Sequence, residues 1–292
     1  MYKLLVVLML YLLLFSSAGA QRKTDREKEN LLGPVRSVRS QSMDYVDGQS
    51  QEKGQTRQLD TVTYAANGNE IERTIYDDFG FLVGKEIHTC DAKGYLLESV
   101  LSDPKGAILE KRAYSYDSGN LLQIITYDEK NRIGLKQVNS YDANHRLREE
   151  TYYDPKNAVG KTIYKYDENG SISEVAFYLA DGSKAVAPIG PCLGAHKVIY
   201  SYDGSSKPNK VVAFEPDGEM KKSWKYTYNR EGQLAEDMRE SVWSSTKFTY
   251  TYEYDSKGNW IKQTGTVIDQ SKSSPTGAFE RKTVISREIS YY

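Results

Sequence analysis

A short motif, tyrosine followed by aspartate and soon by glycine or asparagine, recurs along nearly the whole chain. The clear copies are Tyr76-Asp77, Tyr116-Asp117, Tyr127-Asp128, Tyr141-Asp142, Tyr153-Asp154, Tyr166-Asp167, Tyr202-Asp203 and Tyr254-Asp255. Degenerate copies are Tyr64 before Asn67-Gly68, Cys90-Asp91, Ser102-Asp103, Phe214 before Asp217-Gly218, and Tyr228-Asn229. From Tyr64 to Tyr166 the copies lie 12, 14, 12, 14, 11, 14, 12 and 13 residues apart. A repeat of this kind is one supersecondary unit, so the fold must arise by stacking that unit.

The residues of one unit predict a tight turn between two strands. Asp or Asn can bond its own backbone two residues on, and Gly supplies a positive φ. The fifth residue after the Asp slot is usually apolar: Leu82, Leu96, Ile108, Leu122, Ile133, Leu147, Val159, Ile172, Val186, Met220, Leu234 and Trp260, with Glu70 and Pro208 as exceptions. Between turns the character alternates, as from Thr249 to Tyr254, which is typical of a β-strand.

These units predict an all-β protein. Residues 35 to 292 would hold roughly ten hairpins, or about twenty strands, whereas open sheets seldom exceed about ten strands without curling. Each strand also adds a right-handed twist. We therefore expect an elongated, strongly twisted or partly rolled antiparallel meander of tandem hairpins; the sequence leaves open whether it closes. A Pro/Gly-rich insertion near residues 187 to 197 interrupts the repeat.

The first twenty residues are predicted to be a signal peptide. Lys3 precedes an apolar run from Leu4 to Phe15, and Ser16 to Ala20 ends in a small-x-small cleavage site. A membrane anchor is the rival interpretation, but the run is shorter than the roughly 20 residues a spanning helix needs. The expected organisation is a signal peptide over 1–20, a flexible polar lead-in over 21–34 and one β-sheet domain over 35–292. The mature protein would be secreted, periplasmic or extracellular, by bacterial export.

Charge and composition limit the kinds of molecule that the protein is expected to bind. Without Lys3 the chain has 38 basic and 40 acidic residues, a balance that implies no nucleic-acid partner. Tyrosine is unusually frequent, with 24 residues. The richest aromatic rows are Trp224, Tyr226, Tyr228, Tyr250, Tyr252 and Tyr254. Cross-strand aromatic pairs can simply hold a sheet together, or the rows can form a ligand face for sugars or a partner.

The repeat resembles the YD-repeat, or RHS-repeat, family of extracellular proteins. The residues that carry the likeness are Tyr116-Asp117 through Leu122, Tyr166-Asp167-Glu168-Asn169-Gly170 through Ile172, and Tyr254-Asp255-Ser256-Lys257-Gly258-Asn259-Trp260. The likeness covers roughly residues 60 to 265, and it implies extended β-sheet that spirals into shells and binds carbohydrate or encloses a toxic cargo. This chain departs from the family, since it is far too short for such a shell. It looks closer to a short exported protein made of the repeat alone.

Catalytic and metal-binding interpretations have little support in the sequence. Cys192 and His196, with Asp203 to orient the base, could form a nucleophile and base. Glycine and proline around them indicate an exposed loop instead. The scattered candidates His88, Cys90, Asp91, His145 and His196 lack the spacing of metal ligands, so we expect no metal and no cofactor. Cys90 and Cys192 could form one disulfide only if the sheet rolls up, because they lie about four hairpins apart.

The sequence therefore predicts a non-catalytic exported scaffold or binding module that recognises carbohydrate or an envelope partner. Two alternatives stay open: an enzyme that uses the Cys192/His196 loop, and a cell-surface or toxin-related assembly component. No membrane span is expected after signal cleavage, and the oligomeric state is left undetermined.

Overall fold

The computed structural model describes residues 23–46, 55–77, 79–187, 192–241, 244–271 and 279–292. One short helix, α1 (Asp25–Lys28), precedes eighteen strands. The strands are β1 (Val35–Val46), β2 (Gln55–Tyr64), β3 (Glu70–Tyr76), β4 (Leu82–Cys90), β5 (Leu96–Ser102), β6 (Ile108–Asp117), β7 (Asn120–Asp128), β8 (Ile133–Tyr141), β9 (Leu147–Tyr153), β10 (Ala158–Tyr166), β11 (Ile172–Leu179), β12 (Lys197–Ser201), β13 (Lys210–Phe214), β14 (Met220–Tyr228), β15 (Leu234–Ser241), β16 (Ser244–Tyr254), β17 (Trp260–Ser271) and β18 (Phe279–Tyr291). The all-β antiparallel meander is confirmed.

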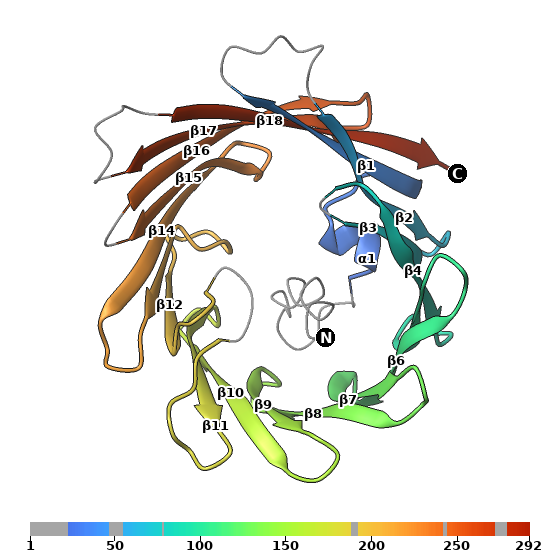
Figure 1. Cartoon of the computed structure of the whole chain (residues 1–292), viewed down its shortest axis with the longest axis vertical. Helices are drawn as coiled ribbons and strands as arrows, with labels where there is room; N and C mark the ends of the chain where they lie inside the picture. The colour runs from blue at the N-terminus through green and yellow to red at the C-terminus, as the bar shows by residue number, and fades with distance from the viewer. Residues whose placement is uncertain (1–22, 47–54, 78, 188–191, 242–243, 272–278) are drawn as a thin grey trace.

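The sheet closes on itself, which corrects the expectation of an elongated or partly rolled meander. Each strand pairs with the next one along the chain, and β18 also pairs with β1 over most of the length of both (Figure 1). Accumulated twist brings the two ends of a long sheet round to each other, and closure removes both unpaired edges. With eighteen strands spaced about 4.8 Å apart and tilted by about 40°, the barrel would be roughly 35 Å across.

The turns have the chemistry that the motif predicts. Asp167 Oδ1 accepts hydrogen bonds from the backbone N–H groups of Asn169 at 3.0 Å and Ser171 at 2.8 Å. Gly170 closes the turn with a φ of 82°, and its N–H donates to the Asp167 carbonyl. The same pair of side-chain bonds, to the second and fourth residues on, recurs at Asp77, Asp91, Asp103, Asp128, Asp142 and Asp255. Each unit therefore carries its own local turn.

The motif tyrosines join one hairpin to the next. Tyr166, at the end of β10, donates its hydroxyl to the Leu147 carbonyl at the start of β9, at 2.7 Å. These two residues belong to successive hairpins that meet at one end of the barrel. Among the described residues, four motif tyrosines make this bond at the same end, which we call the stitched rim: Tyr141 to Leu121, Tyr166 to Leu147, Tyr202 to Ile172 and Tyr228 to Pro208. Two other tyrosines make the same kind of bond there, Tyr252 to Leu234 and Tyr292 to Tyr64. The tyrosine thus supplies contact between units, and the aspartate shapes each unit.

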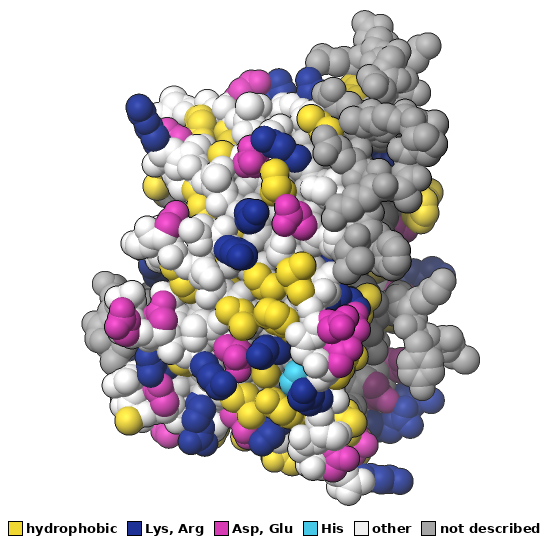
Figure 2. All heavy atoms as spheres, turned by 90° about the vertical axis from the view of Figure 1, so that its left-hand side faces the viewer, with side chains coloured by type: hydrophobic (Ala, Val, Ile, Leu, Met, Phe, Trp, Pro, Cys, Tyr) yellow, Lys and Arg dark blue, Asp and Glu magenta, His cyan; other side chains and the backbone are white. Residues whose placement is uncertain are grey.

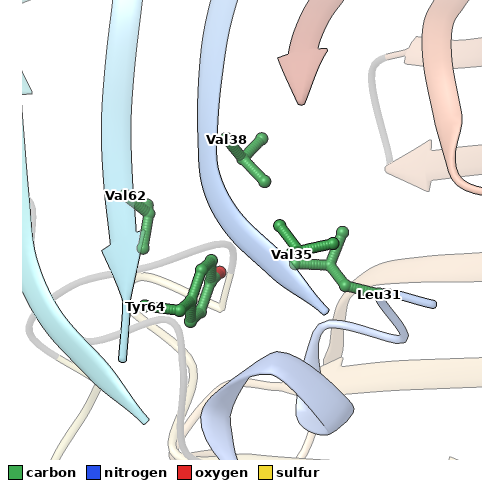
Figure 3. Packing of buried hydrophobic residues seen from close by; sticks show 5 residues of the cluster. All are labelled: Leu31, Val35, Val38, Val62 and Tyr64. Atoms are coloured by element: carbon green, nitrogen blue, oxygen red, sulfur yellow. The ribbon is translucent and has the colours of Figure 1, made fainter. Parts of the chain in front are cut away.

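The short helix α1 lies inside the barrel (Figure 1). We expected a flexible polar lead-in over 21–34; its described part instead begins with a capping box, in which Thr24 and Glu27 each bond the other's backbone N–H. Leu31 then packs with Val35, Val38, Val62 and Tyr64 (Figure 3). These side chains mark the inner face of β1 and β2.

The inner face can be followed around the whole sheet, because residues paired directly across strands point to the same side. Val62 pairs with Arg73, and Arg73 pairs with Glu86. Continued strand by strand, the pairing places Tyr164, Trp224, Tyr226, Phe248, Tyr250 and Tyr252 on the inner face. The inner wall is therefore rich in aromatic side chains.

The outer face carries cross-strand ion pairs. Examples are Lys85 with Glu72 at 2.7 Å and Lys247 with Glu236 at 2.7 Å. Figure 2 shows Lys, Arg, Asp and Glu side chains interspersed with apolar ones on the side that faces the viewer. Such exposed pairs add about 0–1 kcal/mol each.

Candidate ligand-binding wall inside the barrel

The predicted aromatic rows lie on the inner wall, on two strands that are separated by one other strand. Trp224, Tyr226 and Tyr228 belong to β14, and Tyr250, Tyr252 and Tyr254 belong to β16, with β15 between the two strands. The Tyr228 and Tyr252 hydroxyls are used in the stitched rim, and the Tyr254 hydroxyl donates to Gln233 Oε1 at 2.8 Å. Trp224 is buried with Val198, Val211 and Ala213. Part of the predicted ligand face therefore has a structural task, and its ligand role stays a prediction.

A hollow lies beside these rows, on β16, β17 and β18. Its volume is about 210 Å³. The lining residues are Phe248, Tyr250, Gln263, Gly265, Val267, Thr283 and Ile285. Two aromatic rings and two aliphatic side chains supply the apolar surface, and the Gln263 amide and Thr283 hydroxyl supply hydrogen-bonding groups. A largely apolar hollow with a few polar groups is the usual composition of a small-molecule site.

Gly265 shapes the floor of the hollow. It pairs directly with Tyr250 across β16 and β17. A Cβ at Gly265 would lie 3.2 and 3.3 Å from two ring carbons of Tyr250. The missing side chain therefore lets the tyrosine ring lie close against the wall, an arrangement known for glycines that face aromatic residues in sheets.

An ion pair between the buried Asp237 and the exposed Arg239 flanks the hollow on β15. Asp237 is 2% exposed, and its Oδ2 accepts from Arg239 Nε at 2.7 Å and lies 2.6 Å from Arg239 Nη2. The Arg239 guanidinium lies 4.2 Å from the ring centre of Phe248, which lines the hollow. Asp237 Oδ1 has no hydrogen-bond donor in the described part of the chain. Sequence reasoning missed this pair, because β15 carries alternating charges and nothing local says which of them face inward.

The tyrosines of this wall are held in their neutral form. Burial, and after it the nearby Asp237 carboxylate, raises the pKa of Tyr226 and of Tyr250. A neutral phenol both donates and accepts hydrogen bonds. The wall therefore offers apolar rings with polar tips, which suits a ligand that has an apolar face and hydroxyl groups at its edge.

A second polar cluster lies further round the wall, on β8, β9 and β10. The buried Glu150 carboxylate accepts from Tyr152 at 2.8 Å, Tyr164 at 2.7 Å and Gln137 at 3.0 Å. Burial, and then the Glu150 charge, raises the pKa of both tyrosines. These three donors satisfy the carboxylate within the wall. The cluster is therefore an internal hydrogen-bond network.

The inner surface around α1 is filled by the chain itself. A gap of about 30 Å³ remains there, lined by residues that include Glu29, Tyr64, Arg73 and Arg287. This space is about that of one water molecule. The N-terminal segment therefore leaves the hollow at β16–β18 as the larger space of the two.

The structure places the Cys192/His196 loop inside the barrel. Residues 188–191 lie outside the described residues, but Ala195 and Cys192 pack on the apolar cluster of β12, β13 and β14. His196 Nδ1 lies 3.0 Å from the Ala185 carbonyl oxygen, so it is engaged by backbone and not by Asp203. Burial raises the pKa of the Cys192 thiol, the opposite of the shift that activates a nucleophilic cysteine.

Cys90 and Cys192 are not joined to each other by a disulfide. Cys90 ends β4, and Cys192 precedes β12. Seven strands, β5 to β11, lie between them in the sheet, so even a closed barrel holds the two thiols far apart. Within the described ranges, no group of three or more His, Cys, Asp and Glu residues is placed to hold a metal ion.

Comparison with known proteins gives similarity only at the level of solved structures. No family model matches, and no curated protein matches. A porin-like protein from Bacteroides uniformis is similar over 89% of this chain and 98% of its own, with 11% identity and a TM-score of 0.47. The Tc holotoxin pore of Photorhabdus luminescens is similar over 80% of this chain and 16% of its own, with 13% identity and a TM-score of 0.31. A TcdB2-TccC3 complex is similar over 80% of this chain and 18% of its own, with 13% identity and a TM-score of 0.32.

The class of the protein is therefore described from the geometry of its own fold. The described residues form a closed antiparallel β-sheet of eighteen strands with an aromatic inner wall. The likeness to the YD-repeat family remains a resemblance of motif. No helix among the described residues is long and apolar enough to cross a membrane.

Proposed function

We propose that this protein is a non-catalytic exported binding module that takes up carbohydrate on its inner wall. The hollow lined by Phe248 and Tyr250 carries the proposal. A sugar ring presents C–H groups on its faces and hydroxyls at its edge. The two aromatic rings can stack on the faces of the sugar ring, and Gln263 and Thr283 can form hydrogen bonds with the sugar hydroxyls.

The test compares glycan-array binding and calorimetry for wild type and a Phe248→Ala/Tyr250→Ala variant. Stacking on an aromatic ring contributes about 0.5–1.5 kcal/mol beyond the buried area, so loss of both rings should weaken binding at least tenfold. Tyr153→Ala is the matched control, because Tyr153 lies on the outer face under Lys136. A wild type that binds no glycan, or a double variant that binds like wild type, would contradict the proposal.

Export rests on the first twenty residues, which lie outside the described residues. The apolar run Leu4 to Phe15 and the site at Ala20 support cleavage on secretion. N-terminal sequencing of the protein recovered from its native envelope should give Gln21 as the first residue. A first residue of Met1 would oppose the proposal.

Self-association is a second candidate function, supported by exposed apolar side chains at the rim opposite the stitched rim. Phe79 and Phe81, in the turn before β4, are 79% and 71% exposed. Leu82, Ile108 and Ile133, which begin β4, β6 and β8, are 45–50% exposed at the same end. Clustered exposed apolar residues mark interaction sites. Sedimentation over a concentration series should show a dimer that Phe79→Ser/Phe81→Ser removes; monomer at every concentration would refute it.

A further inference from the structure

The ion pair beside the hollow bears on the chemistry of the ligand. Arg239 uses Nε and Nη2 toward Asp237 Oδ2. The described residues give its Nη1 no acceptor, and its side chain is 49% exposed while that of Asp237 is 3% exposed. A guanidinium has a second edge, formed by Nη1 and Nη2, that can bind another carboxylate in a bidentate way.

Asp237 acts as a positioning residue for that edge. Its carboxylate binds one edge of the guanidinium from within the wall. The Phe248 ring contacts the guanidinium, with the ring centre 4.2 Å away. A group fixed from two sides loses less conformational freedom when a ligand binds. Arg239 is therefore set in advance, with its outer edge toward the space inside the barrel.

Two acidic side chains beside the hollow are each paired with an arginine. Asp237 is paired with Arg239, and Asp44, which accepts from the lining residue Thr283, is paired with Arg57. Neither carboxylate therefore opposes an acidic ligand with an unpaired charge, and the attraction for an anion comes from the outer edge of the Arg239 guanidinium.

We propose that the hollow takes a carboxylate-bearing sugar, a hexuronate, with its ring on Phe248 and Tyr250 and its carboxylate on the outer edge of Arg239. This inference rests on the proposed carbohydrate-binding function and specifies its ligand class. A planar carboxylate matches the guanidinium fork, which a sugar hydroxyl engages with one bond only. The carboxylate sits at the rim of a sugar ring, so ring stacking and ion pairing can occur together.

The experiment uses a panel of hexuronate oligosaccharides and their carboxyl-reduced, neutral counterparts, with affinities measured by calorimetry on the full-length mature protein. Wild type should bind at least one hexuronate about 10- to 100-fold more tightly than its reduced counterpart, the range expected for charge-assisted hydrogen bonds. That preference should shrink as sodium chloride rises from 0.05 to 0.5 M, because salt screens the pair. Arg239→Gln should remove the preference, and Arg239→Lys should retain part of it.

Two further variants make the result interpretable. Arg239→Gln leaves Asp237 buried without its cation, so Asp237→Asn/Arg239→Gln removes both charges and protects the fold; it should also lose the preference. Arg132→Gln is the control, because Arg132 pairs with Asp128 in a turn on β7–β8, away from the hollow. Equal binding of acidic and neutral sugars, with Arg239→Gln without effect on either, would overturn the hexuronate inference and leave carbohydrate binding standing. Binding of neither panel would overturn both.

Discussion

The stitched rim makes a quantitative prediction for Tyr166→Phe. The substitution removes only the hydroxyl that donates to the Leu147 carbonyl at 2.7 Å. The ring stays, together with its contact to the Arg146 guanidinium at 4.5 Å. A neutral hydrogen bond of this kind contributes about 1 kcal/mol net, so the free energy of unfolding should fall by about that amount.

The matched control is Tyr153→Phe. Tyr153 ends β9 at the other rim, and Lys136 lies over its ring at 5.8 Å, a contact that phenylalanine keeps. Its loss should stay within about 0.5 kcal/mol, as for most surface changes. A double variant, Tyr166→Phe/Tyr228→Phe, should lose about 2 kcal/mol, because distant sites act additively.

Urea unfolding followed by circular dichroism measures all three variants. The slope against urea should stay at the wild-type value, since the exposed area on unfolding does not change. If Tyr166→Phe and Tyr153→Phe lose the same amount, the hydroxyl bonds do not join the hairpins. A loss of about 2 kcal/mol is also large against the 5–15 kcal/mol of a typical domain.

Three further predictions test the turn, the alkaline response and the hollow. Asp167→Ala removes two backbone hydrogen bonds and should cost about 1–2 kcal/mol by urea unfolding; an unchanged midpoint would count against the turn chemistry. Burial raises the pKa of Tyr166 from 10.0 to about 12, so between these pH values the tyrosine ionises first in the unfolded chain. The free energy of unfolding should therefore fall as pH rises, while tyrosine absorbance at 295 nm follows the ionisation; a free energy of unfolding that stays constant from pH 9 to 12 would contradict this. Gly265→Ala should push the Tyr250 ring off the floor and weaken glycan binding several-fold, whereas Cys192→Ala should leave it unchanged; the reverse pattern would favour the loop as the active element.

Hairpins were predictable from the sequence because their information is local. Asp167 and Gly170 specify one turn through bonds within five residues, and the alternation between turns specifies strands. We expected a flexible lead-in where α1 lies, although Thr24 and Glu27 have the spacing of a capping box. The position of α1 inside the barrel depends on Leu31 meeting Val62 from another part of the chain, and no local pattern encodes that.

The candidate site was predictable in part for the same reason. Alternation puts Tyr226 and Tyr250 on one side of their strands, so an aromatic row was visible in the sequence. Alternation alone does not tell an inner side from an outer side in a barrel with both faces partly polar. Asp237 and Arg239 therefore looked like any charged pair on a solvated strand, and only closure of the sheet shows that they face inward.

Closure itself depends on a property that no single unit carries. Every unit adds a similar twist, but whether the ends meet depends on the sum over all strands and on the match between the first and the last. Here β1 and β18 have twelve and thirteen residues, longer than most strands between them, and they pair from Val35–Tyr291 to Val46–Arg281. Long matched end strands offer more hydrogen bonds at the one seam that no turn holds together. The repeat thus builds the wall, and the non-repeating ends decide that the wall encloses a space in which a ligand can bind.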